Sequence, residues 1–178
     1  MRIPIAKLKA ILRYFGTYTD PRFLGKVKLM KLFYFLDFVH VKKYGAPVTY
    51  DSYVNLEHGP IPSTILNLVN EAIYDADNSA LADTVVFEKS KFIEMFRMKP
   101  LRNFSELDED CFKPSELEVL NTICKRFGDK NTKFIEDVSH AEAPWAKTKL
   151  LDQIPYTLAT LDKDCVVDKE EIELLQLI

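Results

Sequence analysis

The sequence predicts a mainly α-helical fold with a small β component (α+β), in which a compact set of helices carries a short β-hairpin or a small antiparallel sheet. Apolar residues recur at helical spacing through most of the 178 residues. Only two stretches, 48–57 and 84–99, have the residue types of strands. Five glycines are too few for a β fold with many turns. Because this length suits one hydrophobic core, we expect a single domain over residues 1–178.

The first two predicted helices differ in how much of their surface is apolar. Apolar spacing predicts a helix from Ile5 to Phe15, with Gly16 as the residue that ends it. The next helix, about 24–43, is apolar on more than one side, which predicts burial by neighbouring elements. It has one narrow polar strip, spaced by three: Lys28, Lys31, Tyr34 and Asp37. Lys42 and Lys43 suit the helix dipole, and the segment 45–47 (Gly-Ala-Pro) ends the helix.

The two β-like stretches are bounded by turn-forming residues. Residues 48–59 read as one extended segment or a pair of strands. Residues 59–62 (Gly-Pro-Ile-Pro) predict a rigid turn, and Pro62 then opens a third helix that runs through Ile73. Residues 84–100 predict a hairpin around a turn at Glu88–Ser90, although 92–96 could also be helical.

The second half of the chain carries clear helix signals. Ser105 and Asp108 form a capping pattern, and Pro114 opens a helix that Gly128 ends. A short helix fits 131–139, followed by a joint at 139–145. The tail at 168–178 predicts an amphipathic helix with acidic residues in its first turn.

Composition points to a soluble, cytoplasmic protein. The N-terminal residues carry charge throughout and lack the apolar core of a secretory signal. The longest apolar run, 32–36, is far shorter than the roughly 20 residues of a membrane helix, so we expect no membrane contact. Cys111, Cys124 and Cys165 are widely spaced, which is typical of reduced thiols.

Charge is distributed unevenly along the chain. Residues 1–49 hold ten Lys/Arg against two Asp/Glu, whereas residues 50–178 hold fourteen against twenty-five. Either the two parts neutralise each other in the fold, or the basic part forms a face for nucleic acid. The second alternative has no recognised DNA- or RNA-binding signature and an acidic pI of about 5.7 against it. Its candidate contacts are Lys7, Lys9, Arg13, Arg22, Lys26, Lys28 and Lys31.

No pattern in the sequence indicates a catalytic, cofactor or metal site. His40, His58 and His140 are scattered and lack zinc-site spacing, and no nucleotide-binding glycine loop is present. Cys124 and His140 could pair as a thiol centre, but Cys124 lies on the apolar register of its helix, which favours an inert buried thiol. We therefore expect no enzyme, no cofactor and no metal. An uncharacterised enzyme stays as the third functional alternative.

Four segments, in order, resemble one known family. They are KLMKLFYFLDFVHVKKYGAPV (28–48), YVNLEHGPIPSTI (53–65), FSELDEDCF (104–112) and SHAEAPWAKT (139–148). Each alone is weak, but together they resemble the Panacea antitoxin domain of SocA-like antitoxins. The resemblance implies one such domain over 1–178, with an α fold of minor β content.

The family resemblance also implies a function and partners. Members neutralise diverse toxins by direct binding, and some deliver the toxin to a protease as adaptors. We therefore expect a cognate toxin, encoded nearby, as the partner, with a protease as the second partner of an adaptor and the oligomeric state left open. The polar strip either faces a partner or is satisfied internally. The residues predicted to bind a partner are Lys28, Lys31, Tyr34, Asp37, His58, Gly59, Pro60, His140 and Trp145.

Overall fold

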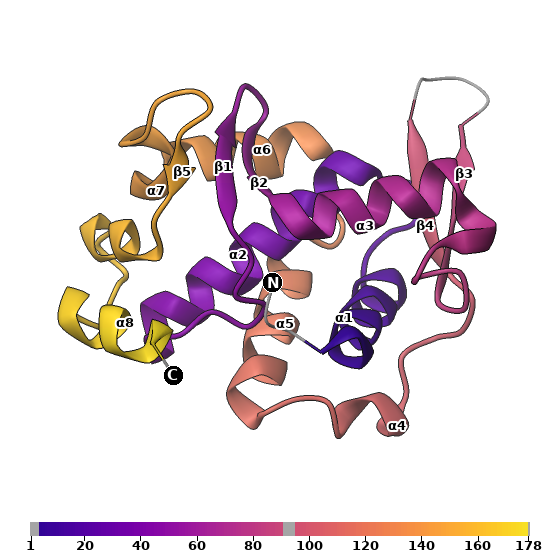
Figure 1. The fold of residues 1–178 in the computed structure, drawn as a ribbon, viewed down its shortest axis with the longest axis horizontal. Helices are drawn as coiled ribbons and strands as arrows, with labels where there is room; N and C mark the ends of the chain where they lie inside the picture. Colours follow the sequence, from indigo (N-terminus) through magenta and orange to yellow (C-terminus); the bar gives the residue numbers. More distant parts are fainter. Residues whose placement is uncertain (1–3, 91–94, 178) are drawn as a thin grey trace.

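The computed structural model describes residues 4–90 and 95–177 and confirms the α+β fold (Figure 1). The long helix α2 (Lys26–Tyr44) crosses the middle of the molecule, and the other elements surround it. The remaining helices are α1 (Ile5–Tyr18), α3 (Ser63–Tyr74), η1 (Ala76–Asn78), α4 (Glu106–Glu109), α5 (Pro114–Phe127), α6 (Thr132–Ala141), α7 (Ala143–Ala146), η2 (Tyr156–Leu161) and α8 (Lys169–Gln176).

The core is built around α2, as its apolar composition predicts. Its aromatic side chains contact rings from several elements, with ring centroids 4.5 Å apart for Phe35 and Phe127 and 5.0 Å apart for Phe38 and Tyr156. Such tilted and edge-on pairs add to the stabilisation that burial of their area provides. The helix ends at Gly45, whose φ of 76° is the left-handed conformation of a helix C-cap. No helix in the described part of the chain is both long and apolar enough to cross a membrane.

The first sheet corrects one prediction from the sequence. Strand β1 (Tyr53–Leu56) lies between β2 (Gly59–Pro62) and the short β5 (Gln153–Ile154), all antiparallel. Residues 59–62 therefore form a strand, and the predicted rigid turn there is wrong. The turn is made by Glu57 and His58, and β2 tolerates its two prolines because it is an edge strand.

The second sheet is the predicted hairpin, β3 (Val85–Lys89) and β4 (Phe96–Pro100). The turn predicted at Glu88–Ser90 is misplaced, because Glu88 and Lys89 still pair with β4. An ion pair of 2.7 Å between Lys99 and Glu88 lies on the exposed side of the hairpin. The alternative helix over 92–96 falls mainly on residues 91–94, which lie outside the described residues.

Gly16 lies inside α1 and does not end it, which corrects the predicted helix end. The helix continues to Tyr18 because the backbone N–H of Thr19 still bonds to the carbonyl of Phe15 at 3.1 Å. A side chain at position 16 would put its Cβ 2.6 Å from Cδ of Pro100. The glycine therefore lets β4 pack directly on α1.

The later helices agree with their predicted signals. The capping box of Ser105 and Asp108 forms at α4, and α5 ends at Phe127. Asn131 and Asp168 cap α6 and α8 with their side chains. The joint predicted at 139–145 is wrong, because α6 continues to Ala141 and α7 begins at Ala143. Glu142 is the N-cap of α7, and Pro144 suits its first turn.

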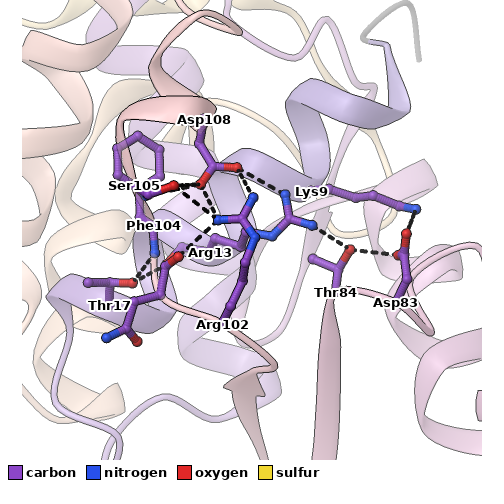
Figure 2. Close-up of polar contacts among 10 residues, drawn as sticks. Lys9, Arg13, Thr17, Asp83, Thr84, Arg102, Phe104, Ser105 and Asp108 are labelled. Carbon is purple, nitrogen blue, oxygen red and sulfur yellow. Dashed lines mark hydrogen bonds and ion pairs between the residues drawn. The ribbon is translucent and has the colours of Figure 1, made fainter.

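Several cations of the basic N-terminal part pair with carboxylates of the acidic remainder. Figure 2 shows Asp108 accepting hydrogen bonds from Arg13 at 3.0 Å and from Arg102 at 2.6 and 2.7 Å. The Arg102 guanidinium is the main reason that the pKa of Asp108 falls to about 2. Lys9 pairs with Asp83 in the same region (Figure 2), and further pairs join Lys7 to Glu116 and Lys43 to Glu118. Lys26, Lys28 and Lys31 instead donate to neutral oxygens, so these ion pairs balance only part of the basic charge, and nucleic-acid binding stays an untested alternative.

Candidate functional site

Helix α2, strand β2 and helix α6 are in contact at Lys31 and Gly59. Lys31 is fully buried in α2, and its Nζ donates to the carbonyl of Pro60 in β2 at 3.0 Å. Burial lowers the pKa of Lys31 to about 7, against the raising effect of Glu136. Gly59 has φ of 97°, and a Cβ there would lie 2.9 Å from Lys31 Cε and 3.1 Å from His140 Nε2. Only glycine suits both this conformation and this approach.

His140 and Trp145 form a stacked pair behind the hairpin. Their ring centroids are 3.9 Å apart and their planes differ by 11°. The indole N–H of Trp145 donates to the carbonyl of Leu56 in β1 at 3.2 Å. Nε2 of His140 is buried and has no hydrogen-bond partner within the described segments. Burial is the first cause that lowers the pKa of His140, and the neutral imidazole is therefore favoured in the stack.

Asn55 fastens β1 to the segment after α7. Its side-chain amide donates to the carbonyls of Trp145 and Thr148, both at 3.0 Å. The backbone N–H of Asn55 donates to Asp152 O, and its carbonyl accepts from Leu151 N. The side-chain partners of Asn55 lie 90 or more residues away along the chain, so the sequence around it gave no local signal.

Tyr34 connects the polar strip to α7 through Glu142. Its hydroxyl donates to Glu142 Oε2 at 2.8 Å, while Lys42 binds Glu142 Oε1 at 2.9 Å. Lys42 also pairs with Asp162 at 2.9 Å and with Asp164 at 3.2 Å. Lys42 is thus a buried anchor as well as a cation near the helix C-terminus. A Glu in the SHAEAPW segment was the available signal for this network, and sequence reasoning missed it.

The two ends of the polar strip hold other parts of the fold. Lys28 donates to the carbonyls of Gly128 and Lys130, at 2.9 and 2.6 Å, and so secures the connection between α5 and α6. Asp37 accepts from the backbone N–H groups of Val48 and Thr49, at 2.8 and 2.7 Å. Burial raises the pKa of Asp37 to about 6, although these hydrogen bonds lower it.

An apolar groove lies beside the turn of the β1–β2 hairpin. It has a volume of about 440 Å³, and its apolar lining comes from α2, the hairpin, α3 and the loop before β5. The exposed fractions of Leu150 and Val27 are 61% and 38%, so the groove opens to solvent. His58 is exposed at its rim, with Nδ1 3.6 Å from Glu136 Oε1. The apolar lining residues are Val27, Met30, Leu56, Ile61, Leu66 and Leu150.

The structure assembles most of the predicted site residues at this place. Lys31, Gly59 and Pro60 meet beneath the hairpin turn, His58 lies on it, and His140 and Trp145 lie beside it. Tyr34 joins them through Glu142, whereas Lys28 and Asp37 lie further along α2. All four polar-strip side chains are buried and bonded internally, so they position surface groups and do not meet solvent.

The sequence's candidate for thiol chemistry, Cys124, is buried in α5. Burial raises the pKa of Cys124 to about 12, so its reactive thiolate is disfavoured. In the part of the chain that the structure describes, no group of three His, Cys, Asp or Glu side chains is placed to hold a metal ion.

The comparison with protein families gives one match. The family model described as antitoxin SocA-like, Panacea domain, matches residues 29–146, which run from the first turn of α2 to the end of α7. The match includes Lys31, the β1–β2 hairpin and the His140–Trp145 pair, whereas Val27 and Leu150 of the groove lie outside it. The chain belongs to this family. In this Panacea domain, the matched region thus holds the buried anchors, the hairpin and the stacked pair. No curated protein and no solved structure matches the chain.

Proposed function

We propose that this Panacea domain is the antitoxin of a toxin–antitoxin pair and that it neutralises its toxin by direct contact. The family supports an antitoxin role in general. The single observation that supports direct contact is the open apolar groove beside the hairpin turn. Exposed apolar surface of this kind, rimmed by polar groups, is typical of protein interaction sites.

The proposed contact surface consists of Val27, Leu56, His58, Leu150 and Leu151. Leu151 is 72% exposed and has φ of 72°, which is costly for a non-glycine residue. Its backbone N–H nevertheless bonds to Asn55 O at 2.8 Å, so β1 holds the strained loop in place. Two exposed leucines, of which Leu151 is held in a strained conformation, lie next to an apolar groove and are well suited to become buried against a partner.

The buried residues act by holding this surface in shape. Lys31 fixes the strand that follows the turn, and Trp145 fixes the strand that precedes it. A surface that is ordered before binding loses less conformational entropy when the partner arrives. Lys28, Lys31, Tyr34, Asp37, Gly59, Pro60, His140 and Trp145 are thus proposed as positioning residues, and His58 as a contact residue.

Neutralisation by occlusion is the form of the mechanism that we propose. The groove and the two leucines would cover the toxin's working surface, with no catalysis and no cofactor. The free thiols of Cys111, Cys124 and Cys165 fit action in the cytoplasm, where toxin and antitoxin are made. Delivery to a protease is the other form, and it predicts that the antitoxin shortens the half-life of the toxin.

Co-expression with the neighbouring gene tests the proposal. The antitoxin and the product of the adjacent gene are expressed from separate inducible promoters, and growth and co-purification are measured. We expect rescue of growth, co-purification and an unchanged toxin half-life. Leu150→Asp should abolish the first two, whereas the matched control Leu107→Asp, at a site 83% exposed on α4, should not. Failure of the unsubstituted chain to rescue growth and to bind would refute the proposal.

A further inference from the structure

The β3–β4 sheet has one covered edge and one open edge. On the β4 side, the backbone N–H of Met98 donates to Leu24 O at 3.0 Å, and Gly25 forms a bridge with Arg97. The connection between α1 and α2 therefore covers that edge. No strand of the described chain pairs with the outer side of β3, which lies at one end of the molecule beside the end of α3 (Figure 1).

The hydrogen bonds of the hairpin show which groups β3 turns outward. Leu101 N donates to Thr84 O at 2.9 Å, and Ser90 N donates to Met95 O at 2.8 Å. Because bonded pairs alternate in an antiparallel ladder, positions 84, 86, 88 and 90 bond across the hairpin. The backbone N–H and C=O groups of residues 85, 87 and 89 point away from β4.

Those outward groups are available at two residues. Val85 N is already bonded to Leu81 O at 3.1 Å. For Phe87 and Lys89, no hydrogen bond from residues 4–90 or 95–177 reaches the outward N–H or C=O. An edge strand with unpaired backbone groups is a template for pairing with another chain.

A groove runs beside this open edge. Its volume is about 330 Å³, which is enough for a few side chains of an added strand. Alanines from α3, η1 and the following loop form much of the wall, so little side-chain bulk blocks it. The apolar lining residues are Ala72, Ile73, Ala76, Ala82, Val85, Val86 and Phe87.

Of the described residues that line the groove, one, Asp77, is charged, and the segment that forms the wall is acidic in sequence. Residues 63–84 contain Glu71, Asp75, Asp77 and Asp83 and no Lys or Arg. Asp83 is paired with Lys9, whereas Asp77 lines the groove and is exposed. A basic segment would therefore meet complementary charge at this wall.

We propose that the open edge of β3 binds an extended, basic segment of a partner protein by strand addition. The segment would pair its backbone with Phe87 and Lys89, place alternate apolar side chains in the alanine-lined groove and hold Lys or Arg near Asp77. Backbone pairing gives affinity in such complexes, and side-chain pockets give the choice of sequence. This binding site goes beyond the proposed function, because it lies apart from the groove at Leu150 and does not require the partner to be a toxin.

The test begins with a library of random ten-residue peptides displayed on phage and panned against the full chain. The enriched peptide is synthesised, together with two versions that are N-methylated at alternate positions. Only one alternate set of amides faces β3, so one version should bind roughly tenfold more weakly than the parent and the other should bind equally, since each lost backbone hydrogen bond costs severalfold. The unsubstituted protein serves for all three titrations, so folding of a variant does not enter.

A matched pair of protein variants gives the second measurement. Lys89→Pro removes the outward N–H of an exposed residue without removing a bond to β4, whereas Lys89→Ala keeps it. We expect severalfold weaker peptide binding for the first and unchanged binding for the second. Asp77→Lys should also weaken binding, unlike Glu170→Lys on the distant helix α8.

Four results would overturn the proposal. The first is that panning enriches no peptide, and the second is that the enriched sequence lacks basic residues. The third is equal binding of both methylated versions. The fourth is that Leu150→Asp, and not Lys89→Pro, abolishes peptide binding. A doubling of mass in sedimentation that Lys89→Pro abolishes would assign the edge to a second copy of the chain, and would equally overturn it.

Discussion

The imidazole of His140 stacks on the indole of Trp145 at 3.9 Å, and this contact joins the end of α6 to α7 directly behind the β1–β2 hairpin. Trp145 is the only tryptophan in the chain, so its fluorescence reports on the candidate site alone. The pair therefore offers a direct probe of whether the hairpin is held as the structure describes.

Lowering the pH should quench Trp145 fluorescence with a midpoint below pH 6.5. Burial is the main cause that lowers the pKa of His140, and the charge of Lys31 lowers it further. The imidazolium therefore forms only at a more acidic pH than in an ordinary histidine. An imidazolium against the ring withdraws electron density from the excited indole and quenches it. Fluorescence titration checks this, with His140→Gln as the variant that should show no such step. A midpoint at or above 6.5 would contradict the buried stack.

Substituting Trp145 should separate its stacking from its hydrogen bond. Trp145→Phe keeps a ring face for His140 but loses the donor to Leu56 O, which should lower the free energy of unfolding by about 1 kcal/mol. Trp145→Ala also loses the apolar area and should cost about 2 kcal/mol. Urea unfolding followed by circular dichroism measures both values. Equal values for the two variants would mean that the ring itself contributes nothing.

Gly59→Ala should be among the more damaging small substitutions in the chain. Its φ of 97° disfavours a side chain, and the new Cβ would lie 2.9 Å from both Lys31 Cε and Ser139 Oγ. We expect a loss of about 1–3 kcal/mol in the free energy of unfolding. The neighbouring exposed Glu57→Ala serves as the control and should stay within about 0.5 kcal/mol of the unsubstituted chain. A neutral Gly59→Ala would show that the hairpin does not pack on α2 and α6 in this way.

In the unsubstituted chain, the buried Lys31 should make the free energy of unfolding rise with pH above about 7, and Lys31→Met should abolish this rise. The pKa of Lys31 is about 7 in the folded chain and near 10.5 when unfolded, so the unfolded state binds more protons between these values. Stability therefore rises as pH increases from about 7 towards 10.5, and the penalty for burying the charge is greatest below 7. Chemical unfolding of both proteins at several pH values gives the difference in their free energies of unfolding, and the pH dependence of that difference is the contribution of Lys31. A constant difference across that range would contradict the burial of Lys31.

In the unsubstituted chain, protonation of Asp108 should lower the free energy of unfolding at acid pH, and Asp108→Asn should abolish this dependence on pH. The guanidinium of Arg102, with help from Ser105 and Arg13, lowers the pKa of Asp108 to about 2. The carboxylate thus stabilises the fold above its unfolded value near 3.8, and this contribution is lost as pH falls from about 4 to 2. At pH 7 the substitution should cost about 2 kcal/mol, because Arg13 loses its charged partner in a mostly buried position. Thermal unfolding at pH 7, 4 and 2 compares the proteins, and parallel curves would refute the role.

The sequence predicted the helices better than the contacts between them. The apolar surface of α2 predicted its central position. The capping pattern of Ser105 and Asp108 and the acidic first turn of the tail helix are local signals that the structure confirms. Gly16 and Gly59 were read as signs of a helix end and a turn. Their real constraint is space beside Pro100 and beside Lys31, which depends on residues distant in the chain.

The candidate site was predictable only in part for the same reason. Four ordered motifs gave the family. The structure places most of the residues that were predicted to bind a partner around one hairpin. Asn55 and Leu150 were not singled out, because nothing in their neighbours along the chain distinguishes them, whereas Glu142 was missed although it lies in one of the four motifs. Asn55 gains its importance from Thr148, and Leu150 from a groove that three other elements build.

The central claim is that the groove beside the β1–β2 turn contacts and silences a toxin. Its most direct test is a titration of the purified product of the adjacent gene, assayed for its own activity, with the purified antitoxin. The account predicts inhibition that is complete at a one-to-one ratio with the unsubstituted chain and with Leu107→Asp, and that fails with Leu150→Asp. Undiminished toxin activity with the unsubstituted chain, or equal inhibition by Leu150→Asp, would contradict it.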